Sequence, residues 1–172
     1  MQTRFGILLG AISLVGLSAC ATSVTGPSAS AELQARSGSS VSGRVNLVET
    51  SGGLRVEAQV AGLSPGEHGF HVHEAGDCSA PDASSAKGHF NPAGKAHGHH
   101  ASSERHGGDM PNLVANAAGE AKFSGVVSGL ALSGPNSVLG RSVVIHADPD
   151  DYKLQPAGNS GKRVACGVIV AR

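Results

Sequence analysis

Seven side chains have the types and spacing expected of a site for two metal ions. They are six histidines and one aspartate: His71, His73, His89, His97, His106, His146 and Asp109. Neutral imidazole is a preferred ligand of copper and zinc, and a carboxylate suits zinc. Two of the histidines are two positions apart, and four of the other five residues fall between His89 and Asp109. We interpret this pattern as a two-metal site.

The first part of the pattern is a histidine pair in the β-prone run Gly69–His73. Residues i and i+2 of a strand point to the same face, so His71 and His73 can reach one metal while Val72 faces the other way. Such a pair alone is more often a surface pair. His146 ends the apolar run Ser142–Ile145 and is the kind of distant histidine that completes a metal site.

The second part lies in a long segment, residues 74–111, in which Gly, Ser, Pro and His dominate. The three imidazoles and one carboxylate between His89 and Asp109 suit a closed tetrahedral zinc site. A metal would also hold in place a loop that has no core of its own. The alternative is a solvated loop that is merely rich in His and Gly.

Short β-prone runs must position these side chains. They are predicted over residues 41–49, 54–60, 67–73, 112–117, 120–128, 141–146 and 163–170, with a second loop over 147–161. Turn sequences such as Ser51–Gly53 separate them, and no convincing helix or internal repeat is present. Many short strands at regular spacing indicate an all-β sandwich or barrel.

The N-terminus has the features of an export signal. Met1–Arg4 is basic, and Phe5–Leu17 is an apolar run of signal-peptide length, too short to span a bilayer comfortably. Leu17–Cys20 resembles a bacterial lipobox, in which Cys20 would be lipidated. The alternative is an ordinary secretory signal cut near Ala19 or Ala21. Either interpretation predicts an exported protein.

The chain is therefore predicted to have three parts. Residues 1–19 would be a lipoprotein signal peptide. Residues 20–40 would be the lipidated cysteine and a flexible tether, because they are rich in Ser, Ala, Thr and Gly. Residues 41–172 would form a single folded domain. Lipidation predicts a periplasmic protein anchored to a membrane, and Ala21 after the cysteine favours the outer membrane over the inner one.

Cysteine count and charge add two constraints. If Cys20 carries lipid, Cys78 and Cys166 remain as an even pair in an oxidising compartment, where a disulfide can form. The alternative is two buried free thiols. The 13 basic and 13 acidic residues give a near-neutral chain, which argues against a nucleic-acid partner.

Five segments of the chain resemble the copper/zinc superoxide dismutases, in the order and spacing of that family. These segments are Gly69–Glu74, Gly88–Pro92, Arg105–Asp109, Val144–His146 and Gly158–Gly167. The resemblance covers essentially all of residues 41–171 and is far more specific than any single motif. It implies an eight-stranded Greek-key β-barrel or sandwich with two long functional loops.

The resemblance also assigns the ligands to metals. It implies a copper site made by His71, His73, His89 and His146, and a zinc site made by His89, His97, His106 and Asp109. His89 would bind both metals through its two ring nitrogens, as an imidazolate. Asp150 matches the aspartate that hydrogen-bonds the far nitrogens of His71 and His97.

Further residues match supporting positions of the family. Cys78 and Cys166 match its disulfide, and Arg163 matches the arginine beside the open copper position, where it would bind the superoxide anion. His68 matches a histidine that bonds to the backbone rather than to a metal. His99 and His100 match no ligand and are expected to be exposed, while Lys153 and Lys162 are candidates for steering the anion.

The resemblance implies dismutation of superoxide to dioxygen and hydrogen peroxide, with copper as the redox metal and with Arg163 and His89 as catalytic residues. The main rival is a non-enzymatic protein of the same fold that binds or delivers copper. Members of that kind typically lack some of the metal ligands or the arginine, and this chain keeps all of them. A surface lipoprotein with incidental metal would leave the ligand set unexplained. A homodimer is compatible with the resemblance.

Overall fold

The computed structural model describes residue 2 and residues 26–172 of the chain. The predicted signal peptide, apart from residue 2, and the predicted lipidation site at Cys20 lie outside the described residues. None of the described helical segments is long and apolar enough to cross a membrane.

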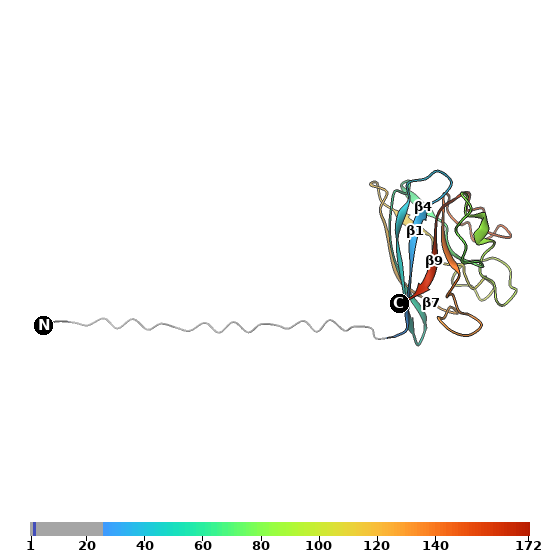
Figure 1. Ribbon diagram of the computed structural model, residues 1–172, viewed down its shortest axis with the longest axis horizontal. Helices are drawn as coiled ribbons and strands as arrows, with labels where there is room; N and C mark the ends of the chain where they lie inside the picture. The colour runs from blue at the N-terminus through green and yellow to red at the C-terminus, as the bar shows by residue number, and fades with distance from the viewer. Residues whose placement is uncertain (1, 3–25) are drawn as a thin grey trace.

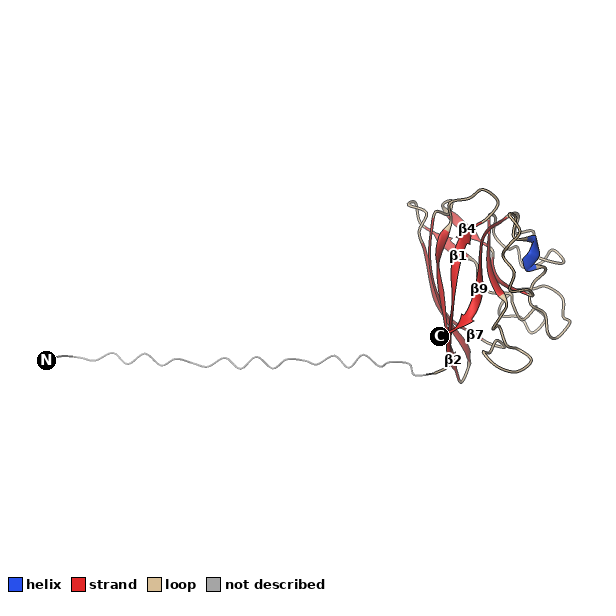
Figure 2. Ribbon diagram, in the orientation of Figure 1, coloured by secondary structure: helices blue, strands red, loops and turns tan. Residues whose placement is uncertain are grey.

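The described residues form nine β-strands and one short 3-10 helix at Ser84–Ala86, which confirms the all-β prediction (Figure 2). In the third strand, Leu54, Val56 and Ala58 are buried and alternate with more exposed residues, as expected of a sheet with one wet face. The strands are β1 (Ser28–Ala35), β2 (Ser42–Thr50), β3 (Gly53–Ala61), β4 (Gly66–His68), β5 (Phe70–His73), β6 (Leu113–Ala115), β7 (Ala121–Val127), β8 (Ser142–His146) and β9 (Arg163–Ala171).

The strands form a nearly closed antiparallel barrel. Their spatial order is β4-β6-β7-β3-β2-β1-β9-β8-β5. The first and last strands of this order, β4 and β5, are separated in the chain by Gly69 alone, so one continuous segment joins the two ends of the sheet. The sequence predicted β4 and β5 as a single strand, and counted in that way the barrel has the eight strands expected of the Greek-key fold.

The first strand corrects one prediction. Residues 20–40 were expected to be a flexible tether, yet β1 lies inside the sheet and pairs with both β2 and β9. Its residues Ala29, Ala31 and Leu33 are buried and alternate with polar ones. Small alanines and serines gave this strand a tether-like composition, while pairing on both sides supplies the hydrogen bonds that hold it. The folded domain therefore begins by Ser28, and not at residue 41.

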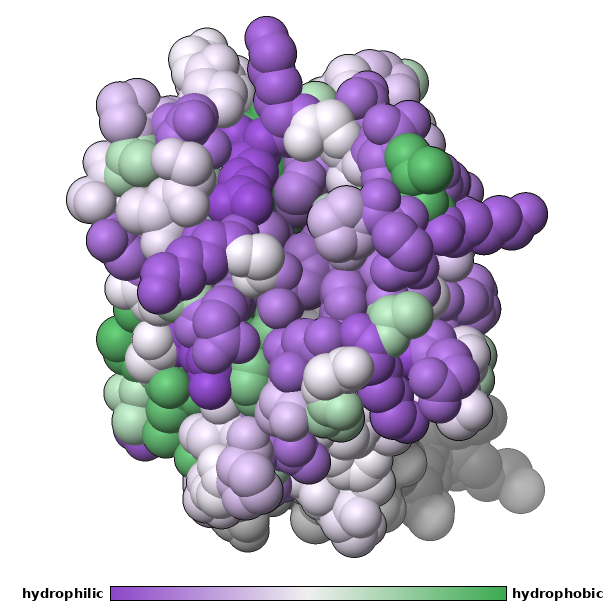
Figure 3. All heavy atoms as spheres, turned by 90° about the vertical axis from the view of Figure 1, so that its right-hand side faces the viewer, coloured by the Kyte–Doolittle hydropathy of each residue, from purple (hydrophilic) through white to green (hydrophobic). Residues whose placement is uncertain are grey.

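The two long connections that the sequence predicted are present, and they lie together on one side of the barrel. They are residues 74–112, between β5 and β6, and residues 147–162, between β8 and β9 (Figure 1). This side presents mostly hydrophilic residues to solvent (Figure 3). The barrel interior on the other side of β5 is filled by Phe70, Leu47, Leu54 and Ile169, all fully buried. The packed barrel thus gives the loops a rigid base.

Candidate metal centre

The structure brings all seven predicted ligands together, in two groups that share His89. One group is His71, His73, His89 and His146, and the other is His89, His97, His106 and Asp109. Within each group the candidate ligand atoms lie within 4.8 Å of one another, and every residue is buried. The groups match the predicted division into two sites, and the identity of the metal at each site stays a prediction.

Strand pairing explains why residues far apart in the chain meet here. β5 carries His71 and His73 and pairs with β8, which ends at His146. The long loop returns along β5, where Asp109 is bridged to His71 and His89 to His73. β5 therefore carries two of the ligands and pairs with the residues His89, Asp109 and His146 or with the strand that contains them.

In the first group, hydrogen bonds leave one ring nitrogen of each histidine free to bind a metal. His71 bonds through Nε2, and its buried Nδ1 has no partner. His73 donates from Nδ1 to the Lys87 carbonyl at 2.9 Å, which directs its Nε2 to a point 3.4 Å from Nε2 of His146. Nε2 of His89 is also buried without a partner. Four imidazole nitrogens thus face a common space.

In the second group, three ring nitrogens surround one carboxylate oxygen. Oδ1 of Asp109 lies 2.8 Å from Nδ1 of His89, 3.1 Å from Nδ1 of His97 and 3.4 Å from Nδ1 of His106. The other oxygen, Oδ2, accepts bonds from the backbone N–H groups of Gly98 and His106. This arrangement directs three nitrogens and one oxygen to a common point, as a tetrahedral zinc site requires.

Buried nitrogens without partners show that these residues fit metal ions. Nδ1 of His71 and Nε2 of His89 make no hydrogen bond although they are inaccessible to solvent. An unsatisfied buried polar group costs about 1–3 kcal/mol, so such groups call for an explanation. A bound cation supplies one, and all-nitrogen and nitrogen-carboxylate donor sets suit copper and zinc respectively.

Burial and neighbouring charges set the protonation of the ligands. Burial holds the pKa of His73 and of His146 well below its usual value, and it lowers the pKa of His89 to about 4. These imidazoles are neutral at pH 7, as metal ligands must be. At His97 burial also acts to lower the pKa, but hydrogen bonds to Asp109 and Asp150 outweigh it and raise the pKa to about 9.

Asp150 bonds to both predicted partners. Its Oδ2 lies 2.7 Å from Nε2 of His71 and its Oδ1 lies 3.0 Å from Nε2 of His97. Burial raises the pKa of this carboxyl group, but the hydrogen bonds with the two histidines outweigh burial and lower the pKa below its ordinary value. Asp150 therefore stays ionised and fixes one ligand of each group.

Two amide side chains that sequence reasoning missed hold this arrangement. Asn112 accepts a bond from the backbone N–H of Asp150 and donates one to its carbonyl, at 3.0 and 3.1 Å. The side chain of Gln155 likewise accepts a bond from the backbone N–H of His97, at 2.9 Å, and donates one to the carbonyl of His97, at 2.8 Å. Because both bonds in each pair join segments far apart in the chain, local sequence patterns gave no sign of them.

Arg163 lies at the rim of an open pocket beside the first group. The guanidinium donates to the carbonyls of Ala83 and Lys87, both at 2.7 Å, so its position is fixed. The steering candidates Lys153 and Lys162 are exposed but do not line this pocket. The pocket has a volume of about 320 Å³ and is lined by His146, Leu154, Gln155, Pro156, Ala157, Asn159, Ser160, Gly161 and Arg163.

The remaining sequence predictions have clear outcomes. Cys78 and Cys166 form a disulfide, which excludes the alternative of two free thiols. His68 bonds to the backbone as expected, with its ring nitrogens 2.9 Å from the His146 carbonyl and 2.8 Å from the Ser64 carbonyl. His99 is exposed as expected, whereas His100 is half-buried against the rings of His99 and Tyr152.

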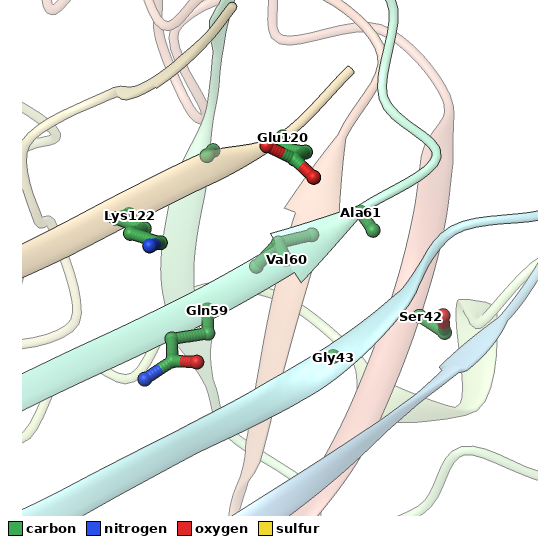
Figure 4. Close-up of a pocket in the computed structure, with 8 residues that line it drawn as sticks. Ser42, Gly43, Gln59, Val60, Ala61, Glu120 and Lys122 are labelled. Carbon is green, nitrogen blue, oxygen red and sulfur yellow. The ribbon is translucent and has the colours of Figure 1, made fainter. Parts of the chain in front are cut away.

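A second hollow lies on the outer surface of the sheet, away from the ligands (Figure 4). It spans β2, β3 and β7, and its charged groups are Glu120 and Lys122. None of the predicted site residues lines it. The concentration of convergent, buried and unsatisfied donors identifies the loop side of the barrel as the functional side.

Comparison with known proteins agrees with this geometry. The sequence model of a family described as copper/zinc superoxide dismutase matches residues 41–169. Superoxide dismutase [Cu-Zn] 2 of Aquifex aeolicus is 41% identical over 98% of this chain and 99% of its own. Superoxide dismutase [Cu-Zn] of Deinococcus radiodurans is 41% identical over 91% of each chain. A crystal structure described as that of the clock protein EA4 superposes with a TM-score of 0.78 and 39% identity, covering 87% of this chain and 98% of that one.

Proposed function

Because the chain belongs to the copper/zinc superoxide dismutase family, we propose that it converts superoxide to dioxygen and hydrogen peroxide at this two-metal site. Two superoxide anions and two protons give one molecule of each product. The observation that carries the proposal is the position of His89, whose two ring nitrogens belong to two different ligand groups. A buried imidazole with a metal donor set on each side is the arrangement that a site for two neighbouring metals requires.

The four-histidine group would hold copper, and the group containing Asp109 would hold zinc. Copper, when bound, supplies the one-electron redox change, and zinc supplies fixed positive charge. The 320 Å³ pocket opens beside the first group, and His146 is the ligand that lines it. A small anion can therefore approach the four-histidine group through this pocket.

Two side chains act on the substrate and its protons. Arg163 presents a fixed cation at the pocket rim, where it binds and orients the superoxide anion. Nε2 of His89, which faces the four-histidine group and has no other partner, is the atom that takes up a proton and passes it to the substrate.

Metal analysis combined with a superoxide-consumption assay tests the proposal. We expect the purified protein, loaded with both metals, to hold one copper and one zinc per chain and to accelerate superoxide loss. The rival function, copper binding or delivery without catalysis, predicts the same metal content with no acceleration. That outcome would refute the enzymatic function.

Replacing the pocket cation tests the route to the site. Arg163→Ala should lower the superoxide rate by about 10-fold or more and reduce its sensitivity to salt, because a fixed charge beside the reacting group is lost. Arg172→Ala, at the opposite end of β9, changes the net charge equally and should leave the rate unchanged. Loss of copper from Arg163→Ala would show that Arg163 has a different role.

We also propose that the protein is a periplasmic lipoprotein, with residues 1–19 removed as a signal peptide and Cys20 carrying the lipid. The lipobox-like segment Leu17–Cys20 supports this, and the disulfide suits an oxidising compartment. The outer membrane is the favoured location because Ala21 follows the cysteine. Cys20→Ser should release the protein from membranes without changing its specific activity, and unchanged membrane fractionation would contradict the anchor. A homodimer stays a prediction that sedimentation of the purified protein tests.

A further inference from the structure

Arg163 is held at both of its ends by segments distant in the sequence. Its guanidinium is fixed by the carbonyls of Ala83 and Lys87, which belong to residues 78–87. We refer to residues 78–87 as the disulfide segment because it begins at Cys78. At the other end, the backbone carbonyl of Arg163 accepts a bond from Oγ of Ser37 at 2.8 Å. The orientation of Arg163 therefore depends on the distance between β9 and the disulfide segment.

The turn between β1 and β2, residues 36–39, contacts both of these parts. Nε of Arg36 donates to the Cys78 carbonyl at 2.8 Å, and the N–H of Ser37 donates to the Pro81 carbonyl at 2.7 Å. The same turn bonds β9 through the N–H of Arg36 and Oγ of Ser39, both of which donate to the Val164 carbonyl. The turn thus joins the disulfide segment to β9 by hydrogen bonds.

The disulfide joins the same two parts covalently. Cys78 starts the disulfide segment and Cys166 lies in β9, three residues after Arg163. The segment has little core of its own, because its buried apolar side chains are Ala83 and Ala86, packed on Val144 and Cys166. Its position therefore depends on the covalent link and on its hydrogen bonds rather than on apolar packing.

We propose that Arg36 is a positioning residue for Arg163. The turn it belongs to holds the disulfide segment against β9 independently of the Cys78–Cys166 bond, so the pocket cation keeps its orientation when that bond is reduced. The inference rests on the proposed function in one respect, since it takes Arg163 as the group that binds the substrate anion. It assigns a function to a turn that precedes residues 41–169, the part of the chain that the family's sequence model matches.

The physical reason lies in the guanidinium of Arg36. A hydrogen bond from a charged donor is about twice as strong as a neutral one, and Arg36 directs Nε to a carbonyl of the first residue of the segment. Its Nη1 and Nη2 bond to the carbonyl of Ala35 and to the side chain of Gln34, which fix the side chain in this direction. Removing the Arg36 side chain removes this charged hydrogen bond and leaves the Ser37–Pro81 backbone bond, the two bonds of Arg163 itself and the disulfide as links to the segment.

The test compares Arg36→Ala with Arg44→Ala in the protein loaded with copper and zinc. Arg44 is a matched control because it lies on β2, pairs with Glu32 of β1 and makes no contact with the disulfide segment. Copper and zinc contents and melting temperatures are measured first, so that global unfolding is recognised. Ser37→Gly is a second variant, since it removes only the Oγ bond to Arg163 and suits the positive φ of 52° at this position.

Two measurements then separate positioning from simple stability. The first is the rate at which dithiothreitol reduces the disulfide, followed by alkylation and mass change. Cys166 is fully buried and Cys78 is half-buried, so opening of the segment exposes the bond further, and we expect about 10-fold faster reduction in Arg36→Ala than in Arg44→Ala. The second is the affinity of the Cu²⁺ site for azide, by optical titration, with the disulfide intact and in a Cys78→Ala, Cys166→Ala background, because dithiothreitol would also reduce the copper. Wild type should lose about 2-fold in affinity without the disulfide, and Arg36→Ala about 10-fold.

Equal reduction rates and equal azide affinities in the two arginine variants would overturn the proposal. A fall in melting temperature with no change in azide affinity would also overturn it, because Arg36 would then be a structural residue only. Failure of the wild-type protein to consume superoxide would refute the proposed function instead. The reduction rates would still report on the link between Arg36 and the disulfide segment.

Discussion

At the scale of single residues, Asp150 links the two ligand groups although it contributes no ligand atom itself. Each of its oxygens bonds the far nitrogen of one ligand, His71 or His97, and so directs the near nitrogen toward the metal. A residue with a side chain does not fit in place of Gly158, because an added Cβ would lie 1.8 Å from Oδ1 of Asp150 and φ is +67°. A glycine is therefore required behind the carboxylate.

Replacing the carboxylate should weaken metal binding more than it weakens the fold. We expect Asp150→Asn to lower zinc affinity by about 10–100-fold, because one amide group cannot accept from both imidazoles as two carboxylate oxygens do. A competitive titration with a zinc chelator measures this. Asp151→Asn is the matched control, since the Oδ1 of Asp151 accepts only from the backbone of its own turn. Equal affinities in the two variants would show that Asp150 does not position ligands.

The pKa of His97 predicts how zinc binding depends on pH. With this pKa raised to about 9, the imidazole is protonated at pH 7 in the metal-free protein, and zinc must displace that proton. His89, with a pKa of about 4, is already neutral. Zinc affinity should therefore rise about 10-fold per pH unit from pH 7 to about 9 and then level off. Zinc titrations at several pH values test this, and an affinity independent of pH would contradict it.

At the scale of elements, β5 determines the site and β1 completes the structure that supports β5. β5 carries two ligands, pairs with β8, and is bridged to His89 and Asp109 of the long loop, residues 74–112. β1 lies between β2 and β9 in the sheet, and its following turn contacts the disulfide segment. Alanine and leucine side chains of β1 fill the barrel interior. The strand thus contributes both pairing and core.

A chain that starts at residue 41 should fail to form a stable barrel. Without β1, the edges of β2 and β9 are exposed and the apolar surface around Leu33 is open to water, so we expect no cooperative thermal transition. A chain that starts at Gly26 should unfold cooperatively, because it retains the strand. Circular dichroism during heating compares the two. Equal melting temperatures would show that β1 is dispensable.

At the scale of the whole molecule, a packed barrel carries two loops that depend on links other than a core. In residues 74–112, the buried apolar side chains are few, Phe90, Met110, Ala83 and Ala86. These loops are held by the disulfide, by the hydrogen bonds of the Asn112 and Gln155 side chains, and by the metal ligands. The metals are therefore expected to stabilise the fold as well as to provide the reaction.

Metal removal should lower stability substantially. We expect a chelator to reduce the melting temperature by about 10 °C or more, because binding free energy of the metals is gained only in the folded state. Calorimetry before and after chelation, with metal content measured in each sample, tests this. Adding copper and zinc back should restore the original transition. A melting temperature that does not respond to metal would show that the loops are held without it.

The sequence by itself determined the chemistry of the site. The residue types that can bind a metal are evident from the sequence. The i, i+2 spacing of His71 and His73 already places both on one face of a strand. The pattern of turns and alternation also predicted most strands to within a few residues. Each of these features is local, so it can be read without knowing which segments meet.

The tertiary structure decided what depends on segments that are distant in the chain. β1 has the composition of a tether, and only pairing with β2 and β9 makes it a strand. Asn112, Gln155 and Arg36 each bond a backbone group about 40 or more residues away, and nothing in their surroundings in the sequence distinguishes them. A hydrogen bond requires its partner within about 3 Å, and the fold alone determines which groups come that close.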